Sequence, residues 1–150
     1  MTEEHASKED FYLIETLLWR GDCDSAEFLH GFWLLHGHLS RLERSARFFG
    51  FPFAAADALK KLRTLSGSLM SGYGHPKKSA AKVRCILKRS GDFEIDQVQP
   101  FSEPSALITV DISKKRVDPE DIFLYHKTSK RGLFDQERRR LDSEGIFETL

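Results

Sequence analysis

The sequence predicts an α+β fold in which an antiparallel sheet is covered on one face by two helices. Short runs alternate apolar and polar residues and are joined by turns that contain glycine, as in antiparallel hairpins. Two longer stretches repeat their apolar residues every three or four positions, which is typical of amphipathic helices. Because strands and helices do not alternate regularly along the chain, their order favours an antiparallel sheet over a parallel βαβ arrangement.

The composition is that of a globular protein of ordinary size. The 150 residues are 40% hydrophobic and 31% charged, and 23 basic side chains balance 23 acidic ones. A formal net charge of zero gives no general attraction to nucleic acid or membranes. No apolar run reaches the roughly 18–20 residues of a membrane span. We therefore expect a cytoplasmic protein without nucleic-acid or membrane partners, in which Cys23 and Cys85 are free thiols.

The first elements follow from apolar runs. Residues 1–10 are polar and predict a mobile leader, whereas the run from Phe11 to Trp19 predicts a strand. A second apolar run, residues 32–35, is expected to pair back on the first strand.

Two helices are expected next. Apolar residues recur at spacings of three and four from His38 to Phe49, and Gly50 followed by Pro52 ends this helix. A second helix is expected from Ala55 to Leu65. Residues 66–78 predict a loop, because they contain three glycines and a proline.

The second half of the chain predicts strands before a last helix. A hairpin is expected from two strands, residues 83–88 and 93–98, around a turn at Ser90-Gly91-Asp92. Alternating apolar residues predict a further strand at residues 105–112.

The last segment predicts a charged helix from Gly132 to Glu144 that stops at Gly145, and then the beginning of a strand. We interpret the chain as a leader, an α+β domain at residues 11–118, and residues 119–150 as a lysine-bearing segment that starts an incomplete second domain.

Residues 123–131 carry the main candidate for chemistry, Lys127, between an apolar, strand-like stretch and the charged helix. A lysine becomes a nucleophile toward aldehydes when burial and nearby positive charge lower its pKa. His126, Lys130 and Arg131 are the neighbours that would supply such charge. Local composition alone favours an exposed lysine in a basic loop, because nothing local requires burial.

Arg41 and Arg44 are the second candidates. An arginine near the start of a helix offers a phosphate group both a fork of N–H donors and free helix amides. We expect Arg41 in the first turn after His38. By spacing alone, a surface arginine that is solvated or paired with Glu43 is the more ordinary interpretation.

Other polar residues are weaker candidates. Glu15 stands alone in an apolar run and is expected to pair with a backbone amide or an arginine. His30, His36 and His38 lack a metal-binding spacing, so we predict no metal site. The basic runs are scattered, which disfavours nucleic-acid binding.

Four motifs in the same order resemble those of the class IV (fold-type IV) aminotransferases, over about residues 11–150. The stretch from His38 to Phe51 is similar to the family's His-Leu-x-Arg-Leu-x-x-Ser-Ala-x-x-Phe-Gly-Phe. Leu13–Thr16 looks like the first strand of the 4-amino-4-deoxychorismate lyase branch, and Val83–Leu87 like its Val-Arg-x-x-Leu hairpin. Residues 125–135 resemble the family's His-Lys-Thr-x-x-Arg-x-Leu-Tyr-Asp, with Phe134 in place of the tyrosine.

The resemblance implies the N-terminal domain of a class IV aminotransferase plus the first helix of its second domain. It implies the cofactor pyridoxal 5′-phosphate (PLP), with Lys127 as the Schiff-base lysine that also moves protons at the substrate Cα. It implies that Arg41 contacts the cofactor's phosphate. The implied partners are a small-molecule substrate, aminodeoxychorismate or an amino acid, and a second copy of the chain in a homodimer.

The resemblance leaves three interpretations of function open. The first is a lyase that forms 4-aminobenzoate and pyruvate for folate synthesis. The second is an aminotransferase of the branched-chain or D-amino acid type, and the third is a non-catalytic remnant or interaction domain. The family's carboxylate partner for the pyridine nitrogen lies downstream of Leu150, so a truncated chain is expected whose own activity stays open. An exposed apolar strand edge at residues 140–150 predicts self-association.

Overall fold

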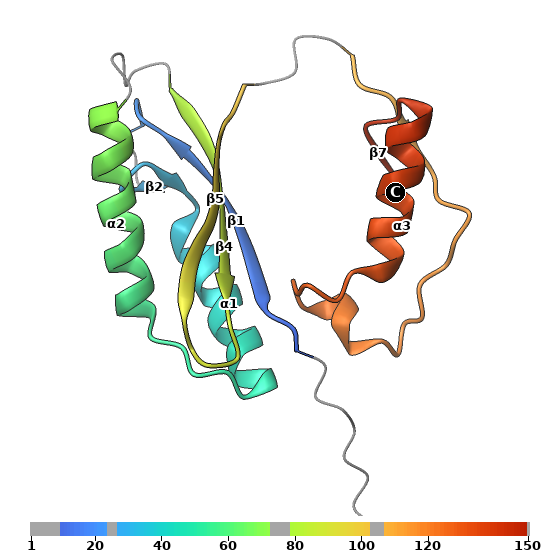
Figure 1. Cartoon of the computed structure of the whole chain (residues 1–150), viewed down its shortest axis with the longest axis horizontal. Coiled ribbons are helices and arrows are strands. Elements are labelled where there is room, and N and C mark those ends of the chain that lie inside the picture. The colour runs from blue at the N-terminus through green and yellow to red at the C-terminus, as the bar shows by residue number, and fades with distance from the viewer. Residues whose placement is uncertain (1–9, 24–26, 73–78, 103–106, 150) are drawn as a thin grey trace, which may run out of the picture.

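A computed structural model of the chain describes residues 10–23, 27–72, 79–102 and 107–149. These residues form a five-stranded sheet in the order β2-β3-β1-β4-β5, two helices against it, and a C-terminal region with a third helix (Figure 1). The predicted α+β class, with an antiparallel sheet and covering helices, is confirmed. The predicted leader lies outside the described residues except for its last residue.

Three long strands form the centre of the sheet. β1 (Leu13–Arg20) pairs along its whole length with β4 (Ala80–Leu87), and β4 pairs with β5 (Phe93–Pro100). The predicted first strand and the predicted hairpin are therefore confirmed. Because strand side chains alternate between faces, one face of β1 and β4 supplies much of the core. Its buried apolar residues are Leu13, Leu17, Trp19, Ala81, Val83, Cys85 and Leu87.

A short hairpin extends the sheet beyond β1. β2 (Phe28–Leu29) pairs with β3 (Phe32–Trp33), and β3 pairs with β1, so the predicted return of the second apolar run is confirmed. His30 and Gly31 connect the two strands with φ of 53° and 79°, which is the two-residue turn that matches strand twist. A Cβ at Gly31 would lie 2.7 Å from Nε1 of Trp19, so the turn also needs glycine for space.

Helix α1 (Leu35–Phe49) begins three residues earlier than predicted and ends as predicted at Gly50, with φ of 70°. Leu34 precedes the helix in the left-handed conformation. Strand β3 therefore ends at Trp33, although the apolar run predicted that it would continue through residue 35. The predicted apolar stripe faces the sheet, with Leu42 and Ala46 buried in the core.

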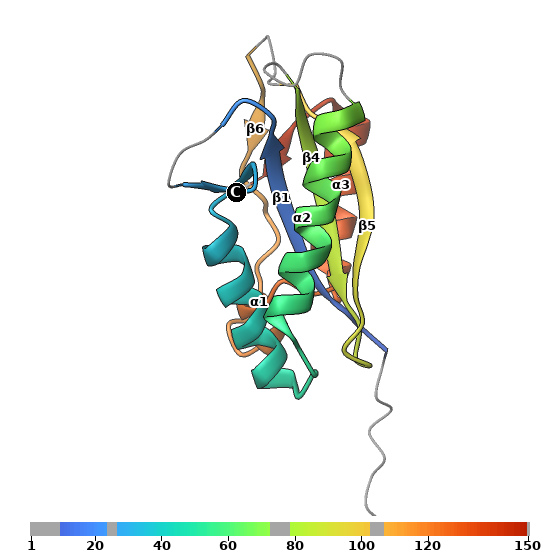
Figure 2. The same cartoon turned by 90° about the vertical axis from the view of Figure 1, so that its left-hand side faces the viewer.

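Helix α2 (Ala55–Gly72) continues past its predicted end, so the predicted loop is wrong as far as Gly72, and residues 73–78 lie outside the described residues. A tertiary contact overrides the loop-like composition. The Ser66 hydroxyl accepts a hydrogen bond from Nε1 of Trp19 at 3.0 Å and donates one to the His30 carbonyl at 2.7 Å. Figure 2 shows α1 and α2 on one face of the sheet and the third helix behind the other face.

The C-terminal region, residues 107–149, contains the 3-10 helix η2 (Ile122–Tyr125) and helix α3 (Gly132–Glu144). Strands β6 (Val110–Asp111) and β7 (Glu148–Thr149) pair in parallel beside α3. The predicted charged helix, its C-terminal glycine cap and the strand that follows are confirmed.

Two predictions for this region are wrong. The strand expected at residues 105–112 is reduced to β6 within its described part, and Ile108 and Ile112 stay 49% and 75% exposed. Among the described residues, β6 pairs with β7 alone and over two residues, so no other described strand extends it. The strand-like stretch before Lys127 is the 3-10 helix η2, whose first turn is capped by the Asp121 carboxylate accepting from the N–H of Phe123 at 2.9 Å.

An extended segment at residues 127–129 joins the C-terminal region to the sheet. The N–H of Ile14 donates to the Lys127 carbonyl at 2.8 Å, and the N–H of Ser129 donates to the Tyr12 carbonyl at 2.9 Å. The segment therefore continues the sheet beside the first residues of β1.

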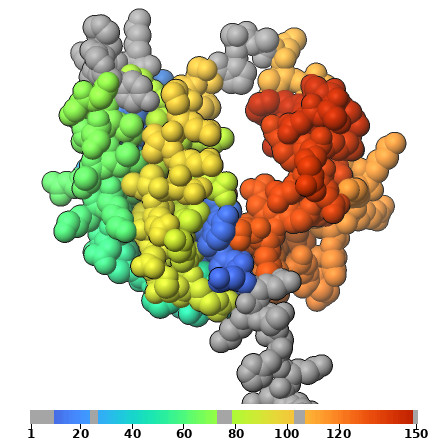
Figure 3. Space-filling view, viewed as in Figure 1, coloured from blue at the N-terminus to red at the C-terminus, as the bar shows by residue number. Residues whose placement is uncertain are grey.

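In the space-filling view the C-terminal region meets the rest of the molecule near the start of β1, and a gap separates the two farther along (Figure 3). The limits given above for the two domains, at residues 11–118 and 119–150, stay predictions.

Candidate active site

The side chain of Lys127 lies beside β1 rather than in open solvent. It is half-buried, and its Nζ lies 3.4 Å from Oγ1 of Thr16. Because the Lys127 carbonyl accepts from the main chain of β1, the sheet fixes the position of the residue that carries the amine.

The surroundings of Lys127 make its amine more acidic. Burial lowers its pKa below the usual value, and Glu15 acts in the opposite direction. Positive charge lowers the pKa further, from Arg41, Arg131 and Arg84. Arg131 is one of the chain neighbours from which this effect is expected. The other two arginines come from α1 and β4, which the local sequence does not reveal.

Lys127 lines a cavity of about 410 Å³ between η2, the start of α3 and one side chain of α1. The lining carries four basic side chains: Arg41, Lys127, Lys130 and Arg131. No carboxylate is among the described residues that line it. Such a set of N–H donors and positive charges suits an anionic ligand.

Arg41 is held by Glu15, a carboxylate of β1 that is 3% exposed. Nε of Arg41 donates to Oε1 of Glu15 at 2.7 Å, and Nη2 donates to Oε2. The expectation that Glu15 pairs with an arginine is confirmed. Glu43, considered above as a partner of Arg41, instead lies 3.7 Å from Arg47. Since α1 begins at residue 35, the placement of Arg41 in the first helical turn is wrong, and it lies in the second.

His38 completes the contacts of the Glu15 carboxylate, with its Nδ1 2.8 Å from Oε2. Burial by itself raises the pKa of Glu15, but the hydrogen bonds from Arg41 and His38 outweigh it and hold the pKa below its usual value. Glu15 is therefore ionised at neutral pH. The sequence predicted His38 as the first residue of this helix, but it is the fourth residue of α1.

His126 anchors the lysine segment to α1. Its Nδ1 lies 3.0 Å from Oγ of Ser45, and its ring stacks on Phe48 with centroids 4.5 Å apart. Burial lowers the pKa of His126, so the ring is neutral at neutral pH. Ser45 is 81 positions away in the sequence, so local patterns gave no signal for this contact.

The remaining candidates take no part in this cavity. Arg44 is exposed on α1. Cys23 and Cys85 are both free, and burial raises the pKa of Cys85 to about 12, which makes its thiol unreactive at neutral pH. In the part of the chain that the structure describes, no group of three or more His, Cys, Asp and Glu residues could hold a metal ion. No helix within the described ranges is both long and apolar enough to cross a membrane.

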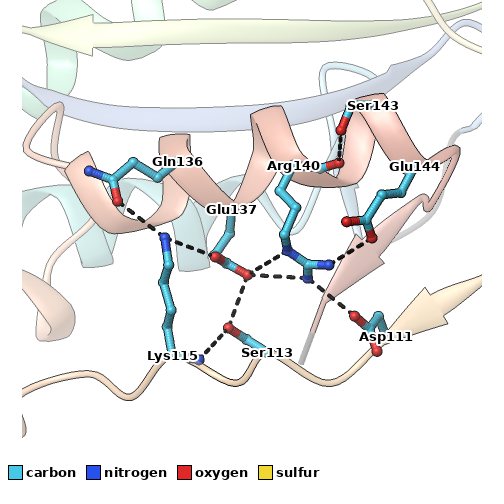
Figure 4. A network of polar contacts seen from close by, with 8 residues as sticks. All are labelled: Asp111, Ser113, Lys115, Gln136, Glu137, Arg140, Ser143 and Glu144. Atoms are coloured by element: carbon cyan, nitrogen blue, oxygen red, sulfur yellow. Dashed lines mark hydrogen bonds and ion pairs between the residues drawn. The ribbon is translucent and has the colours of Figure 1, made fainter.

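Within the basic run at residues 138–140, Arg140 is engaged with acidic side chains of the molecule. Arg140 donates to Glu137, to Glu144 and to Asp111 of β6 (Figure 4). These contacts tie α3 to the strand beside it and leave Arg140 poorly placed to bind a polyanion.

Comparison with known proteins identifies the fold. The family described as amino-transferase class IV matches residues 13–150. The crystal structure of a proposed amino-acid aminotransferase from Mesorhizobium loti is 26% identical, with a TM-score of 0.73 over 94% of this chain and 61% of that one. A proposed 4-amino-4-deoxychorismate lyase from Haemophilus somnus 129pt is 19% identical, with a TM-score of 0.59 over 93% and 61%, and shows likeness of fold alone.

The chain thus spans about three fifths of the length of these two solved structures. No curated protein matches it. The fold expected from the resemblance is confirmed.

Proposed function

Since the chain belongs to the class IV aminotransferase family, we propose that it binds PLP covalently through Lys127. The proposal depends on one observation above all, the half-buried amine of Lys127 with its lowered pKa in a cation-lined cavity. Only a neutral amine attacks an aldehyde, and a lowered pKa raises the neutral fraction near pH 7.

The cavity residues fit the cofactor's phosphate. Nε and Nη2 of Arg41 are used by Glu15, whereas Nη1 has no hydrogen-bond partner among the described residues. We assign this nitrogen to the phosphate, with Lys130 and Arg131 adding positive charge. When bound, PLP would supply the electron sink that stabilises a carbanion on the substrate.

The chain's own groups would position the ligand and move protons. The amine of Lys127 would take up and return the proton at the substrate Cα, and the hydroxyl of Thr16 would orient that amine. His126 would keep the lysine segment on α1. The lining residues that the structure describes offer no acid for the pyridine nitrogen, so binding of PLP and full catalysis are separate proposals.

For the reaction, we propose the 4-amino-4-deoxychorismate lyase type, which forms 4-aminobenzoate and pyruvate for folate synthesis, because two of the four sequence motifs, Leu13–Thr16 and Val83–Leu87, resemble that branch. The second candidate is an amino-acid aminotransferase, favoured by the higher identity to the Mesorhizobium loti structure. We further propose a homodimer in the cytoplasm, where both cysteines would stay reduced.

The test is reduction of the chain with borohydride in the presence of PLP, followed by peptide mass mapping. A pyridoxyl group on Lys127 is expected, and Lys127→Ala should abolish it. Lys114→Ala, at an exposed lysine outside the cavity, is the matched control and should retain it. A wild-type chain without the adduct would refute cofactor binding and favour the non-catalytic interpretation. Pyruvate release from aminodeoxychorismate, as against amino-group exchange between amino and keto acids, separates the two reactions.

A further inference from the structure

We propose that Glu15 is a positioning residue that makes the Lys127 cavity select phosphorylated over unphosphorylated aldehydes, by holding Arg41 in place. The inference rests on the function proposed above and concerns a residue that does not line the cavity. Glu15 acts through Arg41, which does line it.

The contrast in burial between the two partners supports this role. Glu15 is 3% exposed, whereas the Arg41 side chain is 44% exposed. A long, exposed arginine side chain samples many rotamers, and ordering it for a ligand costs conformational entropy. A two-point link to a buried carboxylate fixes the plane of the guanidinium before any ligand arrives.

The carboxylate itself lies on a strand in the middle of the sheet. β1 is hydrogen-bonded to β4 over its whole length, and Glu15 lies opposite Cys85 in that pairing. His38 holds the same carboxylate from α1, so strand and helix both define its position. The guanidinium orientation is thus set by the sheet and not by the solvent-exposed helix surface.

The orientation also determines which ligand benefits. With two nitrogens bound to Glu15, Arg41 presents its remaining nitrogen, and a phosphate monoester is the part of PLP that needs such a donor. The aldehyde end needs only the neutral Lys127. Removing the Glu15 charge removes an influence that raises the pKa of Lys127, so the amine would be at least as reactive.

The discriminating experiment compares PLP with pyridoxal, which has the same aldehyde but no phosphate. Dissociation constants are measured by absorbance titration, with the reduced Lys127 adduct quantified by mass spectrometry. Glu15→Gln should weaken PLP binding about tenfold or more, which is the loss of about 1.4 kcal/mol, and leave pyridoxal binding within about twofold. Glu43→Gln, at an exposed carboxylate of α1 that pairs with Arg47, is the matched control and should change neither.

A second readout needs no aldehyde. Inorganic phosphate should protect Lys127 from acetylation in the wild-type chain, and the protection should be lost in Glu15→Gln. If Glu15→Gln weakens PLP and pyridoxal equally, Glu15 has only a structural role and the inference is overturned. If Glu15→Gln does not fold, Glu15→Asp replaces it, because the shorter side chain keeps the charge but does not reach for the same two-point link. Glu15→Asp should show a PLP-selective loss in the same direction, and unchanged selectivity would overturn the inference.

The two proposals fail in different ways. If the wild-type Lys127 reacts with neither aldehyde, cofactor binding is refuted and the acetylation assay alone decides about Glu15. Protection by phosphate in the wild type but not in Glu15→Gln then supports the inference, and equal protection of both overturns it.

Discussion

The sheet unit, meaning the described residues from 11 to 102, and the C-terminal region are stabilised in different ways. Every member of the buried apolar cluster lies in the sheet unit. In the described part of the C-terminal region, Leu141 is the one apolar residue that is fully buried. Nine large apolar side chains there are exposed: Leu107, Ile108, Val110, Ile112, Val117, Ile122, Tyr125, Phe134 and Phe147.

Phe123 packs against the core of the sheet unit, but α3 is held to the segment beside it by polar contacts. The buried Glu137 carboxylate accepts from Ser113 at 3.0 Å and from Arg140 at 3.2 Å, and it pairs with Lys115 at 3.2 Å (Figure 4). Apolar burial changes little with pH or salt, whereas charged contacts are sensitive to both. The difference indicates that the sheet unit is stable by itself. The stability of the C-terminal region depends on a few carboxylates and on its attachment to β1.

The largest effect is expected from a cavity in the sheet unit. Leu17→Ala removes a side chain that is 1% exposed and should lower the free energy of unfolding by about 2–5 kcal/mol in urea titration. Ile112→Ala, at a residue 75% exposed, should change it by less than about 0.5 kcal/mol. Similar losses for both variants would contradict the contrast between the regions.

A smaller and local effect is expected from Glu137→Gln. The neutral amide cannot pair with Lys115 and Arg140, so hydrogen exchange should quicken several-fold in α3 and in residues 110–115. The amides of β1 and β4 should keep their protection. Glu144→Gln, which changes an exposed partner of the same arginine, should have a weaker effect. Equal loosening of β1 would show that the two regions unfold together.

Acid should loosen the C-terminal region before the sheet unit. Burial raises the pKa of Glu137, but hydrogen bonds from Ser113, Lys115 and Arg140 hold it below its usual value. A carboxylate with a depressed pKa stabilises the fold above its unfolded pKa, about 4.3, and that contribution is lost as pH falls through the folded value. Exchange protection in α3 should therefore fall below about pH 4 while that of β4 persists. Simultaneous loss in both would argue against the proposed difference.

The smallest effect concerns association. Exposed apolar side chains of the C-terminal region should make the chain self-associate at high concentration, as light scattering after size exclusion would detect. Ile112→Asp should reduce the association, and Lys60→Asp on the far helix α2 should not. A wild-type chain that stays monomeric at every concentration would rule out this role for the exposed residues.

The sequence was sufficient where structure is set locally. An apolar run predicted β1, alternation predicted β4, and the turn at residues 90–92 predicted β5 as its partner. Terminal glycines fixed the ends of α1 and α3. It failed where distant contacts decide. Ser66 extends α2 because Trp19 and His30 bind its hydroxyl, and β6 stays short because only two residues of β7 pair with it.

The candidate site shows the same division. Motif resemblance selected Lys127 and Arg41, which the fold brings to one cavity. The identity of the arginine that binds Glu15 could not be predicted, because many arginines were available and the choice depends on how α1 lies across β1. The Ser45 contact of His126 likewise exists only in three dimensions.

The two main-chain hydrogen bonds between residues 127–129 and the start of β1 have a consequence for engineering. Because peptide groups make them, they survive most side-chain replacements nearby. A library that randomises Leu124, Tyr125 and Phe134 on the cavity wall would therefore change the shape of the cavity while Lys127 keeps its position.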